Sequence, residues 1–191
     1  MKRFAFRLAA TLGIVAYLRG NAQAQNSSPW PVTRLDSVAT VGMPYGGTID
    51  ESGLEAGVLM YTTSTSTNVY EAVMFTPKTT KPLKPGMYLV PDAPKFLSAL
   101  MKVPTRTFSR PKLKASYLIT LPSAPGGQAM HQVYGGFDGF NQEPAALELT
   151  WAIIGSSIYV FRCTYRLAQQ AEAAEDLQHF FSSINFRPVH P

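Results

Sequence analysis

The chain contains 191 residues, with 17 Lys and Arg, 12 Asp and Glu, and a formal net charge of +5. This length suits one domain, since a chain of about 150 residues buries roughly 70% of the surface that it exposes when unfolded. Only one cysteine is present, which excludes a disulfide within the chain.

The N-terminal segment, residues 1–24, has the three parts of a secretory signal peptide. The first part is basic and contains Lys2, Arg3 and Arg7, and the second is the apolar segment LAATLGIVAYL at 8–18. The third is a cleavage site of two small residues, Ala22 and Ala24, separated by one residue. A helix that crosses a bilayer needs about 20 apolar residues, so the apolar part is too short for a lasting anchor. We expect cleavage after Ala24, export to the periplasm or the medium, and no transmembrane span afterwards. The alternative is an uncleaved N-terminal helix.

Removal of residues 1–24 changes the charge of the protein. Four basic residues leave with this segment and no acidic residue does, so the mature chain has 13 basic and 12 acidic residues. A near-neutral exported chain is a poor match for a polyanion such as DNA. We therefore expect no nucleic-acid partner.

The mature chain is expected to form one α+β domain over residues 35–187, after a flexible lead-in at 25–34 and before a tail at 188–191. Alternation of apolar and polar residues, with many β-branched side chains, indicates strands in the first third of this domain. The first predicted strands are 36–44 and a hairpin with arms 57–65 and 69–76.

A proline-rich stretch follows, because nine of the fifteen prolines lie between Pro77 and Pro125. Proline removes a donor from a sheet ladder, so most of this stretch is expected to connect elements. Within it, DAPKFLSALMKV at 92–103 predicts a short middle helix, with Asp92 as N-cap and Pro94 in the first turn.

The second half of the chain predicts further strands and a C-terminal helix. The glycine-rich YGGFDGFNQEP at 134–144 is expected to be a long connection. An amphipathic helix is predicted near the C-terminus, because its apolar side chains recur at helical spacing: Leu177, Phe180, Phe181 and Ile184. The expected strands are 115–122, 128–135, a hairpin over 145–166, and a short last strand at INFR, 184–187.

The hairpin over 145–166 admits two registers. A two-residue loop pairs residue 154 with 157, as glycine-first turns allow. It places Cys163 on the side of Glu148 and Thr150, and Arg162 beside Leu149. A three-residue loop pairs 154 with 158, gathers the apolar side chains with Cys163 on one face, and leaves Arg162 to water. Because a slip of one residue turns every side chain to the other face, the hydrophobic pattern favours the three-residue loop. In that register Cys163 is a buried hydrophobe with an inert thiol.

Signals of catalysis are weak, since no HExxH, GxSxG, CxxC or phosphate-binding glycine loop is present. His131 shares a predicted strand face with Ala129 and Val133, as a satisfied core histidine does. We therefore expect no catalytic residue, no metal site and no cofactor. The rival hypothesis is a secreted or periplasmic hydrolase that combines His131, Asp138 and an unidentified Ser or Thr, or that uses Cys163.

Positive charge concentrates in residues 78–114, which hold nine basic residues and one acidic residue. The flanking ranges 25–77 and 115–191 are both net negative. One interpretation is that the lysines only keep a proline-rich connection soluble. The other is a basic, loop-rich surface for an acidic protein, an anionic glycan or lipid headgroups. The candidate ligand-binding residues are Lys78, Lys81, Lys84, Lys95, Lys102, Arg106, Arg110, Lys112 and Lys114.

Four segments in this order resemble the PsbP-like α/β sandwich, a fold of many small exported bacterial proteins. They are VATVGMPYG at 38–46, NVYEAVMFTP at 68–77, GSSIYVFRCTY at 155–165 and DLQHFFSSINF at 176–186. The resemblance implies an antiparallel sheet with packed helices, and an accessory or binding role instead of catalysis. It transfers no functional residue, because these segments are packing motifs and residues 78–114 have no counterpart in them.

The predicted fold is α+β: a mainly antiparallel sheet of five to seven strands, a short middle helix and an amphipathic C-terminal helix packed on the sheet. The leading functional hypothesis is an exported, non-catalytic accessory or binding protein of the cell envelope. It uses the basic surface of residues 78–114 to bind an anionic partner.

Overall fold

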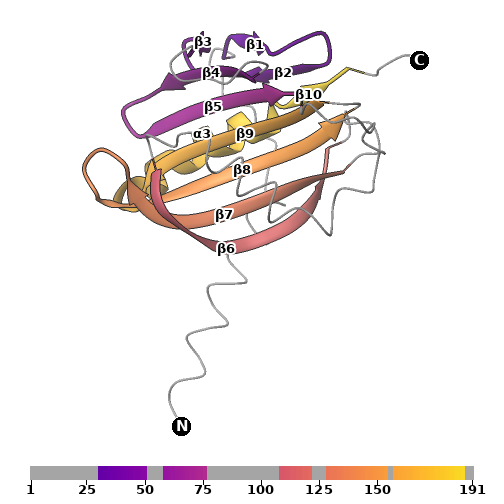
Figure 1. The fold of residues 1–191 in the computed structure, drawn as a ribbon. Coiled ribbons are helices and arrows are strands. Elements are labelled where there is room, and N and C mark those ends of the chain that lie inside the picture. Colours follow the sequence, from indigo (N-terminus) through magenta and orange to yellow (C-terminus); the bar gives the residue numbers. More distant parts are fainter. Residues whose placement is uncertain (1–29, 51–57, 77–107, 122–127, 155–156, 188–191) are drawn as a thin grey trace.

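The computed structural model describes residues 30–50, 58–76, 108–121, 128–154 and 157–187 (Figure 1). The predicted signal peptide and the predicted middle helix over 92–103 lie outside these residues. The three-stranded sheet described below starts at Val32, within the stretch 25–34 for which the sequence predicts a lead-in.

The described chain forms two sheets, and all of their strand pairs are antiparallel. The larger sheet has seven strands in the order β3-β4-β5-β9-β8-β7-β6, and the smaller has the order β1-β2-β10. The predicted antiparallel α+β class is confirmed, and the second sheet adds to it. The strands are β1 Val32–Arg34, β2 Ala39–Gly42, β3 Thr48–Ile49, β4 Val58–Ser64, β5 Asn68–Phe75, β6 Phe108–Thr120, β7 Gln128–Asp138, β8 Pro144–Ile154, β9 Ser157–Arg166 and β10 Asn185–Phe186.

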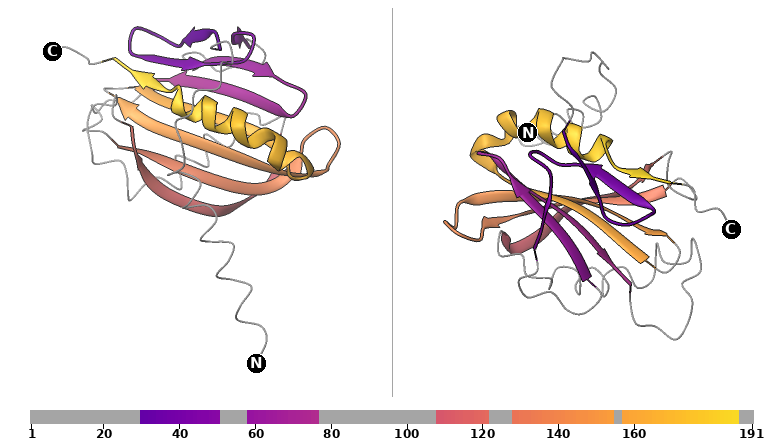
Figure 2. Two further views of the ribbon diagram at one scale, coloured as in Figure 1. Left: turned by 180° about the vertical axis from the view of Figure 1, so that it is seen from behind. Right: turned by 90° about the horizontal axis from the view of Figure 1, so that it is seen from above.

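One helix, α3 (Gln170–Ser182), lies across one face of the seven-stranded sheet, and the small sheet lies beside it (Figure 2). A short 3-10 turn, Leu167–Gln169, links the helix to β9. The buried side chains of α3 are Ala173, Leu177 and Phe180, which share one side of the helix. The predicted amphipathic C-terminal helix is therefore confirmed.

The small sheet joins the two ends of the described chain, because β2 pairs with both β1 and β10. The backbone N–H of Gly42 donates to Ser183 Oγ over 2.9 Å, which ties β2 to the end of α3. Tyr159 of the large sheet donates a 2.6 Å hydrogen bond to the carboxylate of Asp36. These bonds hold the two sheets and the helix as one packed unit around a core that contains Val41, Phe161 and Phe180.

A second buried cluster lies on the opposite face of the seven-stranded sheet. It is centred on Trp151 of β8, which is 1% exposed, together with Val73 of β5 and Val160 of β9. Phe108, at the start of β6, packs in the same cluster. The middle of the sheet is thus buried on both faces. For this reason the sequences of its strands are nearly continuous runs of apolar residues.

Strand β9 shows this most clearly, since all of its residues between its two ends are buried. They include a charged residue, Arg162, whose pairing on β5 is with Glu71. The Nε and one terminal nitrogen of Arg162 donate hydrogen bonds of 2.6 and 2.9 Å to the two carboxylate oxygens of Glu71. Because the pair is bidentate, each charge has a partner with matched geometry inside the protein.

The hairpin of β8 and β9 has the register that the hydrophobic pattern did not favour. Ile154 pairs with Ser157, so the loop has two residues and the prediction of a three-residue loop is wrong. That prediction assumed that only one face of the hairpin is buried and that Arg162 faces water. Arg162 is 3% exposed instead, because Glu71 neutralises it on the buried face.

Other local predictions are confirmed or corrected by the strand boundaries. The predicted hairpin with arms 57–65 and 69–76 corresponds to β4 and β5. The stretch 134–144 is not one long connection, because β7 continues to Asp138 and β8 starts at Pro144. A Cβ on Gly136 would lie 2.5 Å from both the Phe108 ring and the Ser109 carbonyl oxygen. This glycine therefore serves close packing within a strand.

We expect Arg162→Met and Glu71→Met each to lower the free energy of unfolding by about 3–5 kcal/mol, since each leaves a buried charge without its partner. The double variant should lose much less than the sum of the two, because it removes both charges. Urea denaturation measures all three, with the exposed Lys112→Gln as control. Additive losses in the double variant would contradict the proposed coupling.

Candidate binding surface

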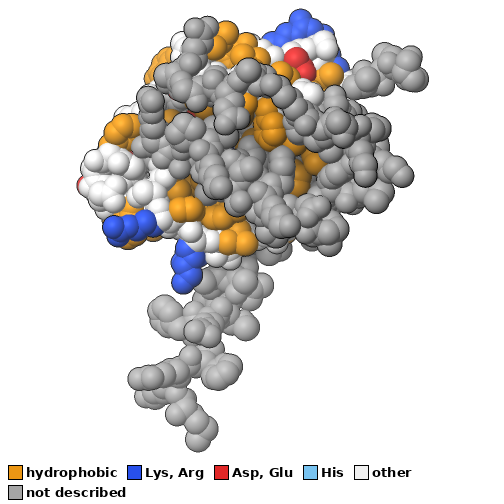
Figure 3. All heavy atoms as spheres, viewed as in Figure 1, with side chains coloured by type: hydrophobic (Ala, Val, Ile, Leu, Met, Phe, Trp, Pro, Cys, Tyr) orange, Lys and Arg blue, Asp and Glu red, His pale blue; other side chains and the backbone are white. Residues whose placement is uncertain are grey.

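Strand β6 forms one edge of the seven-stranded sheet, and three of the predicted ligand-binding residues lie on it. These are Arg110, Lys112 and Lys114, all exposed, and we call them the basic edge. In the described part of the chain none of the three forms an ion pair. The guanidinium of Arg110 instead lies 5.7 Å from the centre of the Phe137 ring. Lysine and arginine side chains are visible along this margin of the molecule in Figure 3.

The backbone around the basic edge is irregular. The pairing of β6 with β7 shifts between Ser109 and Lys112, and again between Leu113 and Ala115. Arg110 has a φ of +52°, in the left-handed region that non-glycine residues rarely adopt. Bulges, proline and cations are the devices by which edge strands avoid pairing with other chains. Here Pro111 lies among the three cations.

The remainder of β6 is regular. Residues 115–120, which we call the open edge, pair with β7 without a further shift. They carry no charge and no proline. Tyr117 is 37% exposed and Leu118 is 50% exposed, and the two side chains point to opposite faces of the sheet. Within the part of the chain that the structure describes, the edge strand therefore has one half with these protective features and one half without them.

The other predicted ligand-binding residues lie outside the described residues: Lys78, Lys81, Lys84, Lys95, Lys102 and Arg106. The structure thus brings together the last three of the nine candidates, on one strand and not on a loop.

A polar cluster surrounds His131 of β7, on the sheet face that α3 covers. The Nδ1 of His131 lies 2.8 Å from Thr150 Oγ1, and its Nε2 lies 3.5 Å from a carboxylate oxygen of Glu148. Tyr165 donates a 2.7 Å hydrogen bond to the other oxygen of Glu148. The ring of Phe181, from α3, meets the imidazole edge-on at 5.2 Å. His131 is therefore a satisfied core histidine, as its strand position predicts.

This cluster contains the Thr, His and acid that the hydrolase hypothesis requires, but in a closed arrangement. Thr150 is 0% exposed, so no substrate carbonyl reaches its hydroxyl. Asp138, the acid named by that hypothesis, lies on the opposite face of β7 and roughly 20 Å further along the strand. The structure does not bring His131 and Asp138 together.

Sequence reasoning missed Glu148 and Thr150 as neighbours of His131. They stand two apart on β8, so they share a face, and β7 pairs Val133 with Glu148 and His131 with Thr150. The polar residues at alternate positions of an otherwise apolar strand were the available signal. Glu148 also acts on its surroundings: after burial, its charge is the next cause that raises the pKa of Tyr165 and of Tyr117.

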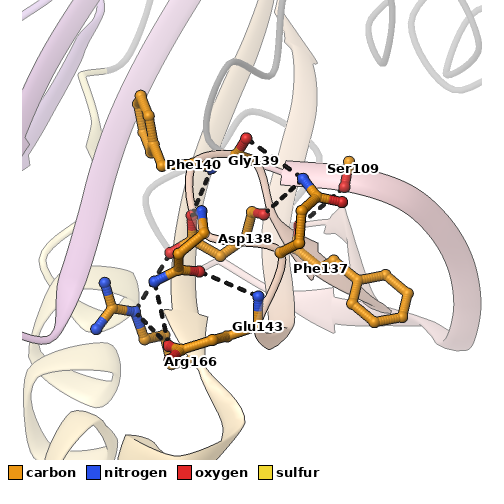
Figure 4. Close-up of polar contacts among 9 residues, drawn as sticks. Ser109, Phe137, Asp138, Gly139, Phe140, Glu143 and Arg166 are labelled. Atoms are coloured by element: carbon orange, nitrogen blue, oxygen red, sulfur yellow. Dashed lines mark hydrogen bonds and ion pairs between the residues drawn. The ribbon is translucent and has the colours of Figure 1, made fainter.

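Asp138 holds the turn between β7 and β8 (Figure 4). One of its carboxylate oxygens accepts a 2.8 Å hydrogen bond from the backbone N–H of Phe140, and the other lies 3.3 Å from Arg166 Nε. The same nitrogen of Arg166 lies 3.3 Å from Glu143. Burial opposes the ionisation of Asp138, but these hydrogen bonds and the Arg166 charge outweigh it and lower its pKa. Asp138 is therefore a turn-forming carboxylate.

Cys163 of β9 is fully buried in the core on the helix side of the sheet. Burial raises the pKa of its thiol well above the ordinary value, and the carboxylates of Glu148, Glu71 and Asp176 add to this. The thiolate is the reactive form of cysteine, so this thiol is inert. The inward orientation is confirmed, although the register from which it was predicted is wrong.

The residues that the structure describes contain no cluster suited to a metal ion and no helix suited to crossing a bilayer. In these ranges no three His, Cys, Asp and Glu side chains stand close enough to hold a metal ion. His131 itself has one carboxylate and one hydroxyl beside it, short of the four donors of a structural zinc site. In the described ranges, no helix is both long enough and apolar enough to cross a bilayer.

Comparisons with known proteins place the fold. No family model and no curated protein matches the sequence. The solution structure of cyanobacterial PsbP from Synechocystis matches with a TM-score of 0.52 at 9% identity, over 88% of this chain and 99% of that one. At this identity the match shows the fold alone. The protein thus has a PsbP-like fold, as the four sequence segments indicate.

Two further solved structures match with a TM-score of 0.44. One is PA94 from Pseudomonas aeruginosa, a protein of unknown function, at 12% identity over 85% of this chain and 100% of that one. The other is the Ran-binding protein Mog1p from Saccharomyces cerevisiae, at 8% identity over 77% of this chain and 89% of that one.

We expect the thiol of Cys163 to resist a water-soluble thiol reagent such as Ellman's reagent in the native protein, and to react fully once urea unfolds the chain. The reason is its complete burial together with its raised pKa. Absorbance at the released thiolate measures both states. Rapid modification without denaturant would revive the nucleophile hypothesis.

Asp138→Asn should lower the stability of the protein at neutral pH, because it removes a carboxylate whose pKa the fold depresses. A depressed pKa contributes stability above the unfolded value of about 4 and loses it as the pH falls through the folded value. The stability difference between the two proteins should therefore shrink in acid. Urea denaturation from neutral pH to about pH 3 checks this; a constant difference would contradict it.

Proposed function

We propose that this protein is an exported, non-catalytic accessory or binding protein of the cell envelope, and that its basic edge binds an anionic partner. The observation that carries the proposal is the set of three exposed cations at a sheet edge, none of them in an ion pair within the described residues. Unpaired cations of this kind attract acidic groups over about 10 Å. The sequence holds six further basic residues between positions 78 and 106.

Two further observations support binding over catalysis. The thiol of Cys163 and the hydroxyl of Thr150 are both fully buried, so neither supplies a nucleophile that substrate can reach. His131 is likewise engaged within the protein by Thr150 and Glu148. Export rests on the pattern of residues 1–24, and no cofactor is part of the proposal.

We expect Lys112→Gln/Lys114→Gln to weaken binding to immobilised heparin and to polyglutamate by about tenfold at low salt, since it removes two of the exposed charges. Binding of the unmodified protein should fall steeply as salt rises. The matched control is Arg34→Gln/Arg187→Gln, which removes two exposed cations from the region of the small sheet. Elution salt and equilibrium titration measure the effect.

Equal losses in the two double variants would show that only net charge matters and would refute a binding role of the basic edge. Binding by the unmodified protein that survives high salt unchanged would refute it as well, because exposed charges are screened under those conditions.

A further inference from the structure

The two edges of the seven-stranded sheet are built differently. At one end stands β3, a strand of two residues, Thr48–Ile49. At the other end stands β6, with thirteen residues, Phe108–Thr120. A very short edge strand offers almost no backbone for pairing, whereas a long one is a template for another strand. The edge formed by β6 is therefore the one that needs protection.

Among the described residues, only half of β6 has that protection. Bulges, a proline and three cations fall together in residues 109–114. The open edge, residues 115–120, has a regular register, and its sequence ASYLIT is uncharged and rich in strand-forming residues. Exposed segments of this composition pair readily with other strands. An unprotected half beside a protected one indicates that the open edge has an occupant.

We infer that the open edge of β6 accepts an extended, acidic peptide segment of a partner protein as an additional antiparallel strand. The inference rests on the proposed function, whose anionic partner it specifies as a peptide. Alternate residues of the open edge direct their N–H and C=O groups away from β7, so an added strand forms main-chain hydrogen bonds with them.

Side chains on both faces of the open edge complete the site. Leu118 stands opposite Met130 of β7, and Tyr117 stands opposite His131. The ring of Tyr117 lies 5.2 Å from the imidazole of His131. Alternate side chains of an added strand would pack on Leu118 at one face of the sheet and on Tyr117 at the other. They would cover the parts of these two side chains that are exposed.

Charge decides the occupant. Strand β6 contains no Asp or Glu, so a second copy paired along residues 115–120 would leave the cations of both copies without partners. A peptide that is uncharged and strand-forming along the open edge and acidic beside Lys112 and Lys114 satisfies both halves of the strand. An acidic peptide therefore complements the charge of β6 better than the β6 strand of a second copy does.

The antiparallel direction fixes the order of the peptide. Every strand pair of the described fold is antiparallel, and such pairs are slightly more stable per residue than parallel ones. An antiparallel peptide starts opposite Thr120 and ends opposite Lys112. Its strand-forming half must come first and its acidic half last.

The test uses the full protein and short peptides with blocked termini, measured by isothermal titration at low salt. The parent peptide is TVTVTVEDE, and EDEVTVTVT has the same composition with the acids first. Two analogues of the parent carry N-methyl groups, one on the valines and one on the threonines. Because an added strand bonds to β6 through alternate residues, one analogue should bind about tenfold more weakly and the other almost as well as the parent.

The expected result also includes weaker binding of the reversed peptide, and slower amide hydrogen exchange within residues 115–120 when the parent peptide is bound. A variant with Lys112→Gln/Lys114→Gln should lose affinity for the parent. If the parent, the reversed peptide and both analogues bind equally, strand addition is refuted while the basic edge still binds acids.

Two other outcomes are separable from these. If no acidic probe binds and Lys112→Gln/Lys114→Gln changes nothing, the proposed function fails together with the inference. If the protein self-associates through β6 and the parent peptide does not dissociate it, the occupant is a second copy and the inference is overturned.

Discussion

The buried ion pair between Arg162 and Glu71 is the interaction on which the rest of the structure depends. It allows β9, the strand at the middle of the sheet, to be buried on both faces even though its sequence contains a guanidinium. Moving an arginine out of water is tolerated only when its charge and donors are matched, and here both carboxylate oxygens of Glu71 accept from it. The pairing fixes β5 against β9, because a slip of one residue would separate the two charges. Because β8 pairs with β9 from Ala145 to Ile154, the position of β9 also fixes the position of β8.

This constraint also explains why the residues that the hydrolase hypothesis names, Cys163, His131 and Asp138, have structural roles in the described chain. A central strand that is buried on both faces carries Cys163 into the core, where its thiol is inert. The same sheet places Thr150 and Glu148 around His131 beneath α3, and their hydrogen bonds satisfy one another. Asp138 is used to close a turn. The exposed cations Arg110, Lys112 and Lys114 lie instead at the margin of the sheet that β6 forms.

The parts of the fold that could be predicted from the sequence are those set by local pattern. The hairpin of β4 and β5 follows from alternation, and α3 follows from apolar residues at helical spacing. The register of β8 and β9 could not be predicted in the same way. Its pattern contains one arginine among apolar residues, and whether that arginine faces water depends on Glu71, which is 91 residues away. The same holds for the basic edge: its charges were visible in the sequence, but their position on an edge strand is a property of the sheet order.

The division of β6 into two halves would link folding to the proposed binding. An edge strand that was wholly protected could not take part in a main-chain interaction, and one that was wholly open would pair with any exposed strand. Cations placed only beside the open edge act in both directions, because they repel basic or like-charged segments and attract acidic ones. In the proposed strand addition, specificity would come from charge at residues 110–114 and affinity from the backbone at 115–120. The register shift between Leu113 and Ala115 separates the regular ladder from the charged half, so a single antiparallel peptide would meet the two halves one after the other.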